Sequence, residues 1–369
     1  MNLSYWEKKS WFSKVDFTIV GSGIVGLNCA LSLKSKYPKA TILILEKGMF
    51  PQGASTKNAG FACFGSLSEI IDDLKSHSEE EVLSLIRKRW DGLQLLRRTI
   101  GDKNLDYLQN GGYELFSEND HLLEESLSKR EAINNLIHPI FKKEVFTTTN
   151  NIFNFKNIKN QYVFNGLEGQ LDTGKMMVAL LQLVLSKGIK IVNNCAVESY
   201  EEQRNSVKIK TTITEFTTGK LLIATNGFAN QFLKEDIQPA RAQVLITKPI
   251  KNLAIKGTFH LDKGFYYFRN IDNRILFGGA RNLDFKTEET TNFGLTTLVQ
   301  NKLEELLTTC ILPDISFEIE QRWSGIMGVG NQKKAIVKPL SSHVYCGVRL
   351  GGMGVAIGSL IGKELADLL

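Results

Sequence analysis

A glycine pattern near the amino terminus constrains the fold of this chain more than any other feature. Residues 19–26 read Ile-Val-Gly-Ser-Gly-Ile-Val-Gly, between an apolar run at 15–20 and a segment with helical spacing. In such a turn the first glycine permits a tight bend, the second lets the backbone approach a pyrophosphate, and the third lets the helix pack closely on the strand. A second apolar run ends in Glu46, twenty residues after Gly26, where a carboxylate can accept ribose hydroxyls. The pattern predicts a strand–helix–strand unit that binds a dinucleotide.

Composition narrows the class of protein further. The chain has 369 residues, 43% of them hydrophobic, which suffices for two domains or one large one. The net charge of +6 comes from scattered lysines and arginines, so we expect a solvated surface and neither a nucleic-acid partner nor an anionic membrane. Five widely spaced cysteines favour a reducing compartment without disulfides or a metal site. Since the first residues are too charged for a signal peptide and no long apolar stretch occurs, we expect a cytoplasmic protein without a membrane span.

Apolar spacing along the chain predicts alternating helices and strands. Asp172 is a plausible N-cap for one of the helices. Helices are expected at 28–36, 67–100, 118–137, 173–187, 290–309 and 353–369. Strands are expected at 189–192, 207–210, 213–216, 221–224, 242–247, 265–268, 275–278, 315–321, 334–337 and 344–348, with a strand-and-loop excursion at 147–165.

A second glycine-rich turn opens the last helix. It contains Gly347, Gly351, Gly352 and Gly354. A domain that binds only NAD has no need for such a carboxyl-terminal return. Two helix amino termini directed at one ligand suit a flavin, because one dipole can face the pyrophosphate and the other the C2 carbonyl of the ring, where negative charge develops on reduction. The expected cofactor is therefore FAD.

Five motifs in the same order resemble those of one enzyme superfamily. They are Ser-Tyr-Trp-Glu (4–7), the Gly21–Gly26 turn with Glu46-Lys47, Gly-Ala-Ser-Thr-Lys-Asn-Ala-Gly (53–60), Ala-Thr-Asn-Gly (224–227), and Leu-Gly-Gly-Met-Gly-Val (350–355). Together they resemble the D-amino-acid-oxidase-like (DAO) superfamily of FAD-dependent oxidoreductases, in the group of glycine, sarcosine and gamma-glutamylputrescine oxidases. The likeness covers nearly the whole chain.

The resemblance implies an α/β fold with a Rossmann-type FAD-binding domain and a discontinuous mixed α+β substrate domain, as in glutathione-reductase-like two-domain flavoproteins. The FAD-binding domain is expected at 1–77, 162–240 and 330–369, and the substrate domain at 78–161 and 241–329. The residues expected to bind the cofactor are Gly21, Ser22, Gly23, Ile24, Val25, Gly26, Glu46, Lys47, Ser55, Thr56, Asn58, Ala59, Gly60, Val197, Ala224, Thr225, Gly227, Gly351, Gly352, Met353, Gly354 and Val355.

The same resemblance implies an oxidase or dehydrogenase acting on a C–N bond of a small amine or amino acid. The substrate would pass a hydride to flavin N5, and the resulting imine would hydrolyse. Oxygen, a quinone or another carrier would reoxidise the flavin. The loop at 53–65 has no histidine beside its serines, and no cysteine lies in 322–335, so noncovalent FAD is expected.

The substrate residues are less well marked than the cofactor residues. Tyr267 lies where family members place a tyrosine over the substrate, with a core aromatic as the alternative. The family's amino-acid oxidases clamp the substrate carboxylate with an arginine in a W-x-G-L-R segment, but this chain has Met327 there. A thioether cannot bind a carboxylate, which puts simple glycine or D-amino-acid oxidation in doubt. Arg349 is the preferred replacement. Arg269 and Arg281 are further candidates, with structural or surface roles favoured for both, and Arg322 is less certain.

The sequence is also compatible with other functions. A same-fold flavoenzyme could act on an amine of a modified tRNA base, and a nicotinamide-dependent dehydrogenase or a binding-only flavoprotein are weaker alternatives. Cys63 and Cys346 are expected to be buried, unreactive thiols. His260 lies in a strand-rich unit, and a structural role is favoured for it over a place near the site.

Overall fold

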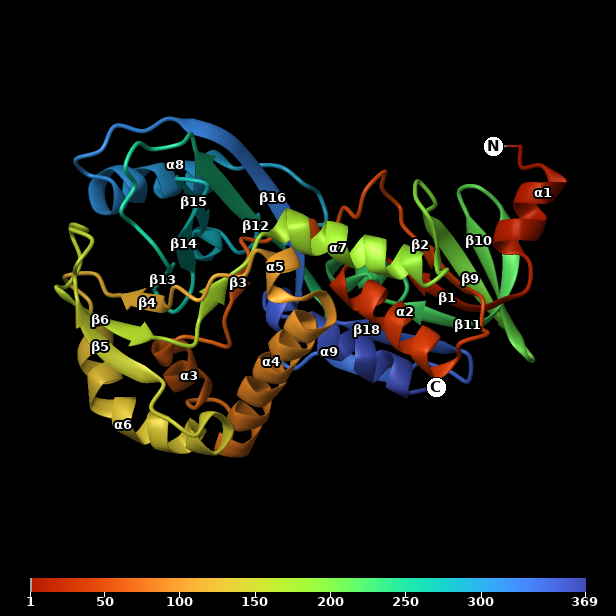
Figure 1. The fold of residues 1–369 in the computed structure, drawn as a ribbon, viewed down its shortest axis with the longest axis horizontal. Helices are drawn as coiled ribbons and strands as arrows, with labels where there is room; N and C mark the ends of the chain where they lie inside the picture. The colour runs from red at the N-terminus through yellow and green to blue at the C-terminus, as the bar shows by residue number, and fades with distance from the viewer. Residues whose placement is uncertain (1) are drawn as a thin grey trace.

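The computed structural model describes residues 2–369, whose strands form two eight-stranded sheets and one short two-stranded ribbon. The first sheet lies on the right of Figure 1 and has the order β17-β18-β11-β1-β2-β8, with β10 and β9 added beside β11. Its strands are β1 (Val15–Val20), β2 (Ile42–Leu45), β8 (Lys190–Val192), β9 (Val197–Gln203), β10 (Ser206–Thr211), β11 (Glu215–Ile223), β17 (Ile336–Pro339) and β18 (Val344–Val348).

The centre of this sheet is parallel and buried on both faces. Strands β18, β11, β1, β2 and β8 run parallel, and β2 is apolar throughout because both of its faces are covered. On one face, Ile19, Ile44 and Leu222 belong to a core shared with helices α2, α7 and α9. On the other face, Val20 and Leu221 pack in a second core with strands β9 and β10. The parallel centre brings the carboxyl ends of β1, β2 and β11 to one edge.

The second sheet lies on the left of Figure 1 and has the order β16-β12-β15-β14-β13-β4-β6-β5. Its neighbouring strands are antiparallel except β13 and β4. Its strands are β4 (Gly112–Leu115), β5 (Phe146–Asn150), β6 (Gln161–Asn165), β12 (Gln238–Thr247), β13 (Thr258–Leu261), β14 (Tyr266–Ile271), β15 (Arg274–Gly279) and β16 (Ile319–Val329); the ribbon pairs β3 (Phe61–Ala62) with β7 (Gly169–Gln170). Phe259 and Phe268 stack with ring centroids 4.5 Å apart in the core beneath this sheet.

Helices cover both sheets and join them. The α-helices are α1 (Tyr5–Glu7), α2 (Ile24–Lys36), α3 (Leu67–Asp73), α4 (Glu79–Ile100), α5 (Asp102–Leu105), α6 (Leu122–Phe141), α7 (Thr173–Ser186), α8 (Thr297–Leu306) and α9 (Gly354–Asp367). Shorter helical turns are η1 (Lys8–Phe12), η2 (Ala54–Thr56), η3 (Asn226–Gln231), η4 (Arg281–Leu283) and η5 (Leu307–Ile311). Helices α2 and α9, from opposite ends of the chain, pack against each other under the first sheet (Figure 1). None of the helices in residues 2–369 is long and apolar enough to cross a membrane.

Several boundaries differ from those predicted by the sequence pattern. The helix expected at 67–100 is two helices, because Ser78 starts a new one with a capping box to Glu81. The helix expected at 290–309 begins only at Thr297, and the residues before it form a loop. The strand expected at 315–321 is β16, which continues to Val329. Asp172 does cap helix α7, accepting a hydrogen bond from the Lys175 backbone.

The sheets also bear on the expected domain limits. Strand β6 and the first residues of β12 lie in the second sheet, whereas the expected division placed them in the FAD-binding domain. The division into five segments stays a prediction. We propose placing two of its boundaries after Asn165 and before Gln238.

Candidate active site

A cavity of about 550 Å³ lies between the two sheets, at the carboxyl ends of β1, β2 and β11. Residues of the first sheet and the loops that follow its strands line one half. Val244 on β12, His260 on β13 and Tyr267 on β14 line the other half. In open α/β sheets, ligands bind outside the carboxyl ends of the parallel strands, so this cavity is the candidate active site.

The amino terminus of helix α2 opens onto the cavity. Gly21 has φ +104°, and a Cβ there would lie 2.9 Å from the carbonyl oxygen of Ala224, so the first turn requires glycine. A Cβ on Gly26 would lie 2.0 Å from the carbonyl oxygen of Gly21, which shows how closely the helix packs on the turn. The N-cap, Gly23, has no side chain to cap the helix, and the Ser55 hydroxyl accepts a hydrogen bond from the Ile24 backbone at 3.0 Å. A phosphate at the positive end of the helix dipole would lie beside this hydroxyl.

Glu46 is held at the end of β2 beside this turn. Its carboxylate accepts hydrogen bonds from the backbone and hydroxyl of Ser22, at 3.1 and 2.7 Å, and from the Gly48 backbone at 3.0 Å. The side chain is buried but still lines the cavity. These three donors fix its direction, so Glu46 is oriented toward a ligand before one arrives.

A second helix terminus reaches the same cavity from the other end of the chain. Gly351 and Gly352, with φ of +59° and +82°, turn the backbone into helix α9, whose N-cap Met353 offers no side-chain hydrogen bond. Nearby, the hydroxyl of Thr225 is buried on the cavity wall without any hydrogen-bond partner. Since buried hydroxyls are nearly always satisfied, this wall fits a polar ligand that supplies the missing partner.

Most of the residues expected to bind the cofactor line this cavity. They are Gly21, Gly23, Ile24, Val25, Glu46, Lys47, Ser55, Asn58, Ala59, Gly60, Val197, Ala224, Thr225, Gly351, Gly352, Met353, Gly354 and Val355. Ser22, Gly26, Thr56 and Gly227 lie behind its surface. Ser22 orients Glu46, Thr56 donates to the Pro51 carbonyl at 2.7 Å, and a Cβ on Gly227 would lie 2.4 Å from the Met327 carbonyl oxygen. These four residues shape the walls.

Tyr267 lies in the other half of the cavity. It is paired in register with His260 on one side and Gly278 on the other. Burial raises the pKa of its hydroxyl to about 12, so the phenol keeps its proton and can donate. A Cβ on Gly278 would lie 2.7 Å from the tyrosine ring, so the glycine makes the space that the ring occupies.

Two of the three expected catalytic side chains are engaged elsewhere. Arg349, the preferred replacement for the missing carboxylate clamp, donates to the Lys334 carbonyl, the Asp236 carbonyl and the Asp236 carboxylate at 2.9–3.0 Å. Arg269 donates to the carbonyls of Ala59, Leu171 and Asn270. Neither residue lines the cavity. The guanidinium of Arg269 donates to backbone carbonyls, and that of Arg349 donates to backbone carbonyls and the Asp236 carboxylate. These arginines therefore hold loops near the cavity in place and do not face a substrate.

Arg281 differs from both. It lines the cavity, and within residues 2–369 its guanidinium takes part in no hydrogen bond or ion pair, lying 4.7 Å over the ring of Phe285. Burial lowers its pKa, but an arginine stays charged at neutral pH.

Met327 lines the cavity as well, with its sulfur 3.3 Å from where a Cβ of Gly352 would lie. Arg322 is directed to Gln300 and Glu304 on α8 and lines a smaller hollow of about 360 Å³.

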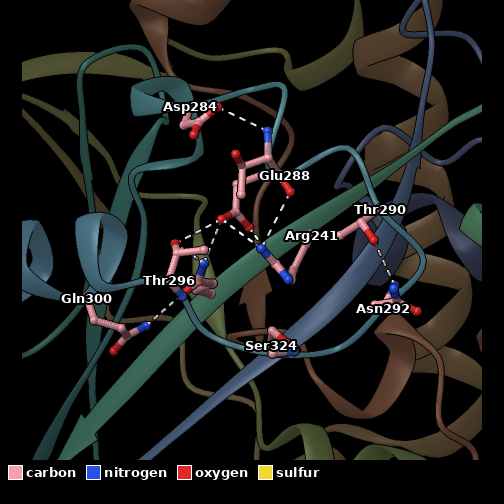
Figure 2. Close-up of polar contacts among 11 residues, drawn as sticks. Arg241, Asp284, Glu288, Thr290, Asn292, Thr296, Gln300 and Ser324 are labelled. Atoms are coloured by element: carbon pink, nitrogen blue, oxygen red, sulfur yellow. Dashed lines mark hydrogen bonds and ion pairs between the residues drawn. The ribbon is translucent and has the colours of Figure 1, made fainter.

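A buried polar network fixes the loop that follows Arg281 (Figure 2). Glu288 accepts two hydrogen bonds from Arg241, at 2.7 and 3.1 Å, and one from Thr296 at 2.9 Å. Gln243 donates to the same carboxylate at 2.8 Å. The loop is therefore tied to strand β12, on which Arg241 and Gln243 lie. The sequence analysis did not predict this network, because Arg241 and Glu288 are 47 residues apart and no local pattern joins them.

Comparison with known proteins agrees with the geometry of the cavity. The family model for FAD-dependent oxidoreductases of the DAO type matches residues 16–368, nearly the whole chain. The chain belongs to this family and is an FAD-dependent oxidoreductase. The two helix amino termini, the Gly21 turn and the unpartnered Thr225 hydroxyl fit that cofactor.

Three proteins similar to this chain share 20% or less of its sequence. The chain is 20% identical to the probable oxidoreductase OrdL of Haemophilus influenzae over 96% of its own length and 82% of that protein. It superposes on glycine oxidase from Geobacillus kaustophilus with a TM-score of 0.76 and 18% identity, over 96% of this chain and 94% of that one. For L-proline dehydrogenase from P. horikoshii the TM-score is 0.74 at 18% identity, over 96% and 93% of the two chains. At such identities the likeness to the solved structures concerns the fold.

Proposed function

We propose that this protein oxidises a C–N bond of a small amine or amino acid that bears a carboxylate. The imine formed would hydrolyse in water. The single observation that carries the proposal is the unpaired guanidinium of Arg281, in the same cavity as the free hydroxyl of Tyr267 and the amino termini of helices α2 and α9. FAD supplies the two-electron acceptor when bound.

The chain's own side chains would bind and orient the substrate. Arg281 would take the carboxylate through a charge-assisted pair, and the Tyr267 hydroxyl would donate to the same substrate from the neighbouring strand. The apolar walls formed by Phe61, Val244 and Met327 would exclude water around the reacting carbon. The family's neighbours include an amino-acid-oxidising glycine oxidase and an iminodiacetate oxidase, which is consistent with this substrate class.

We further propose that the cofactor extends between the two helix termini, with Glu46 at the adenosine ribose, the α2 terminus at the pyrophosphate and the α9 terminus at the flavin ring. Lys47, Ser55 and Thr225 would complete its polar contacts. The attachment would be noncovalent. Oxygen or another electron carrier would reoxidise it.

An anaerobic screen of amines and amino acids tests the proposed function. Purified protein with bound FAD is mixed with each compound, and bleaching of the flavin absorbance is followed without oxygen. We expect bleaching by amines that carry a carboxylate and none by the corresponding amides. Reoxidation by air or by a quinone then distinguishes an oxidase from a dehydrogenase. Bleaching only by a carboxymethylated nucleoside or tRNA would instead favour the alternative of a tRNA-modifying flavoenzyme.

A further inference from the structure

Three buried side chains with metal-binding atoms meet at one wall of the cavity. They are the thiol of Cys63, the carboxylate of Glu168 and the imidazole of His260, and one donor atom of each lies within 4.8 Å of the other two. Their exposed fractions are 6%, 1% and 6%. Within residues 2–369, no other group of histidine, cysteine, aspartate or glutamate side chains converges in this way. Sulfur, imidazole nitrogen and carboxylate oxygen are the atoms that bind zinc in proteins.

Paired strands bring the three side chains together. The antiparallel pairing of β3 with β7 ends at Ala62 and Gly169. The residues just beyond that pair, Cys63 and Glu168, therefore lie side by side. His260 lies on β13, and its Nε2 atom is 2.5 Å from Oε1 of Glu168. Ligands placed by regular strands are held more precisely than ligands placed by loops.

The surroundings of Glu168 and His260 fix both groups and leave room for an ion. Strand β4 has no side chain at Gly112, where a Cβ would overlap the Glu168 carboxylate. Thr258 donates to that carboxylate at 2.8 Å, and Phe61 contacts the imidazole edge to face, with centroids 5.2 Å apart. Two donor atoms that are each about 2.0–2.1 Å from one tetrahedral ion lie about 3.3 Å apart, so a bound ion requires the pair to open by about 0.8 Å.

The charges around the three donors favour a cation. Glu69 lines the cavity beside them, and Glu114 is opposite His260 in the pairing of β4 with β13. Two basic side chains also lie near, but both contact other oxygen atoms. Lys263 donates to the Asp72 carboxylate at 2.9 Å, and Arg89 donates to a backbone carbonyl at 2.9 Å. The acidic groups therefore suit a positive ion at this wall.

A zinc ion would leave the net charge of the cluster unchanged. Burial raises the pKa of the Cys63 thiol well above its ordinary value. Burial by itself would lower the pKa of His260, but the charge of Glu168 raises it to about 9. Without a metal both groups therefore hold a proton at neutral pH, and a metal displaces these two protons. Two protons and one divalent ion carry the same charge, so the exchange buries no additional charge.

One coordination position would stay open toward the cavity. Zinc takes four ligands, of which this cluster supplies three. Cys63 and His260 line the cavity, whereas Glu168 lies behind its surface. Tyr267, which lines the same cavity, is paired in register with His260. The fourth ligand would therefore come from the cavity side, as water or as a donor atom of a bound molecule.

We propose that Cys63, Glu168 and His260 form a zinc site whose fourth ligand comes from the cavity. The inference goes beyond the proposed oxidation and does not depend on it. It departs from the absence of a metal expected from the cysteine spacing. Spacing detects only ligands that are close in sequence, whereas Glu168 and His260 are 92 residues apart. Magnesium and calcium do not suit the cluster, because both prefer oxygen ligands alone.

Metal analysis of the FAD-containing protein, produced without a histidine tag, tests the site. We expect about one zinc ion per chain, or uptake of the same amount when zinc is added after dialysis against a chelator. Cys63→Ala, Glu168→Gln and His260→Gln should each weaken zinc binding at least about 100-fold, more than the loss of an outer contact costs. The FAD content and melting temperature of each variant show whether it has folded.

Matched variants separate the three ligands from other thiols, imidazoles and neighbours. Cys310→Ala removes another buried thiol, and His343→Gln removes another histidine that contacts a glutamate, at 2.9 Å. Neither should change zinc binding. Thr258→Val removes a hydrogen bond to the Glu168 carboxylate and keeps that ligand. Its effect should be smaller, about tenfold, as for other outer contacts of metal ligands.

Cobalt(II) reports the ligands directly. Difference spectra of the FAD-containing protein with and without cobalt should show a thiolate-to-cobalt charge-transfer band and the intense visible bands of a four-coordinate ion. Cys63→Ser should lose the charge-transfer band. A weak, six-coordinate spectrum would contradict a cluster of three mixed ligands.

Three results would overturn the inference. They are protein that neither contains zinc nor takes up added zinc or cobalt, equal zinc binding by Cys63→Ala and Cys310→Ala, and a cobalt spectrum without the thiolate band. Bleaching of the flavin by amines is measured separately. Failure of the proposed oxidation would therefore leave the zinc site standing, and absence of zinc would leave the oxidation standing.

Discussion

Arg269, Arg281 and Arg349 lie near one cavity but differ in what their guanidinium groups contact. Backbone carbonyls and Asp236 take the donors of Arg269 and Arg349, so these side chains cannot also bind a substrate. The donors of Arg281 are free. Sequence spacing could not predict which of the three arginines is free to bind a substrate, because the partners that engage the others lie far away along the chain, up to 210 residues for Arg269. Only the tertiary structure shows which guanidinium groups are engaged by carbonyl and carboxylate oxygens and which one is free.

Replacement of Arg281 by methionine tests this ranking at the residue scale. We expect KM for a carboxylate-bearing substrate to rise about 10- to 100-fold, the range of a charged hydrogen bond of about 1.5–3 kcal/mol. Steady-state kinetics with the carboxylate-bearing substrate gives the measurement. Arg274→Lys, which alters an exposed ion pair with Glu320, is the control. A kcat loss with unchanged KM would contradict a binding role.

At the scale of elements, β14 and β15 place Tyr267 through a glycine. Strand β15 has no side chain at Gly278, and the ring of Tyr267 occupies that space. The glycine is needed for a close approach and not for its backbone angle, since its φ lies outside the left-handed region. A two-residue glycine run at the end of a strand predicts a close contact or bulge. Only the pairing of β14 with β15 shows that the side chain in contact with this glycine is Tyr267.

Gly278→Ala should displace the tyrosine ring. The added Cβ would lie 2.7 Å from the ring, an overpacking that costs about 1–3 kcal/mol of stability. We expect a lower melting temperature and a reduced kcat/KM. Gly166→Ala is the matched control, because its nearest neighbour would be 3.4 Å away. Equal behaviour of the two variants in both assays would show that Gly278 does not set the position of Tyr267.

The loop between η4 and α8 depends on one buried ion pair for its placement. Burial alone would raise the pKa of Glu288, but the hydrogen bonds from Arg241, Gln243 and Thr296 hold it below its ordinary value. A carboxyl with a lowered folded-state pKa contributes stability above its unfolded pKa of about 4.3, and the contribution is lost as pH falls toward the folded value.

Glu288→Gln should therefore flatten the acid side of the stability profile. At neutral pH we expect a loss of about 3–5 kcal/mol, since Arg241 is left buried without its counter-charge. Below about pH 4.3 the difference between wild type and variant should narrow, because the unfolded chain then takes up a proton that the folded carboxylate does not, and the stabilisation is lost once pH falls below the folded pKa. Thermal unfolding from pH 3 to 7 measures this. A constant difference over the whole range would contradict the assignment.

For the whole molecule, the proposed cofactor site joins segments from both ends of the chain. The α2 terminus, the Glu46 loop and the α9 terminus face one cavity, although more than 300 residues separate the first from the last. Ligand bound to the folded state alone stabilises that state by mass action. FAD should therefore stabilise the two-sheet arrangement as well as carry electrons.

Removal of FAD should lower the melting temperature of the protein. At a free FAD concentration about 100 times Kd, the stabilisation is about 2.7 kcal/mol. Thermal unfolding of stripped and reconstituted protein gives the comparison, with FAD added in steps. A melting temperature independent of FAD concentration would mean that the cofactor does not bind in the folded cavity. NADH at equal concentration serves as the control and should have no effect.

Short sequence motifs were sufficient to predict the class of cofactor that this protein binds. The Gly21–Gly26 turn, Glu46 and the Gly351–Gly354 turn depend on local backbone geometry, which a short motif encodes, and they predicted the FAD cofactor. The DAO-type fold was predicted from the resemblance of five such motifs to those of a known superfamily. Tertiary structure alone decided the substrate half. Whether an arginine binds a carbonyl or faces the cavity, and whether His260 meets Glu168, depends on partners from distant strands. Such pairings arise only when the sheets assemble, so no local pattern records them.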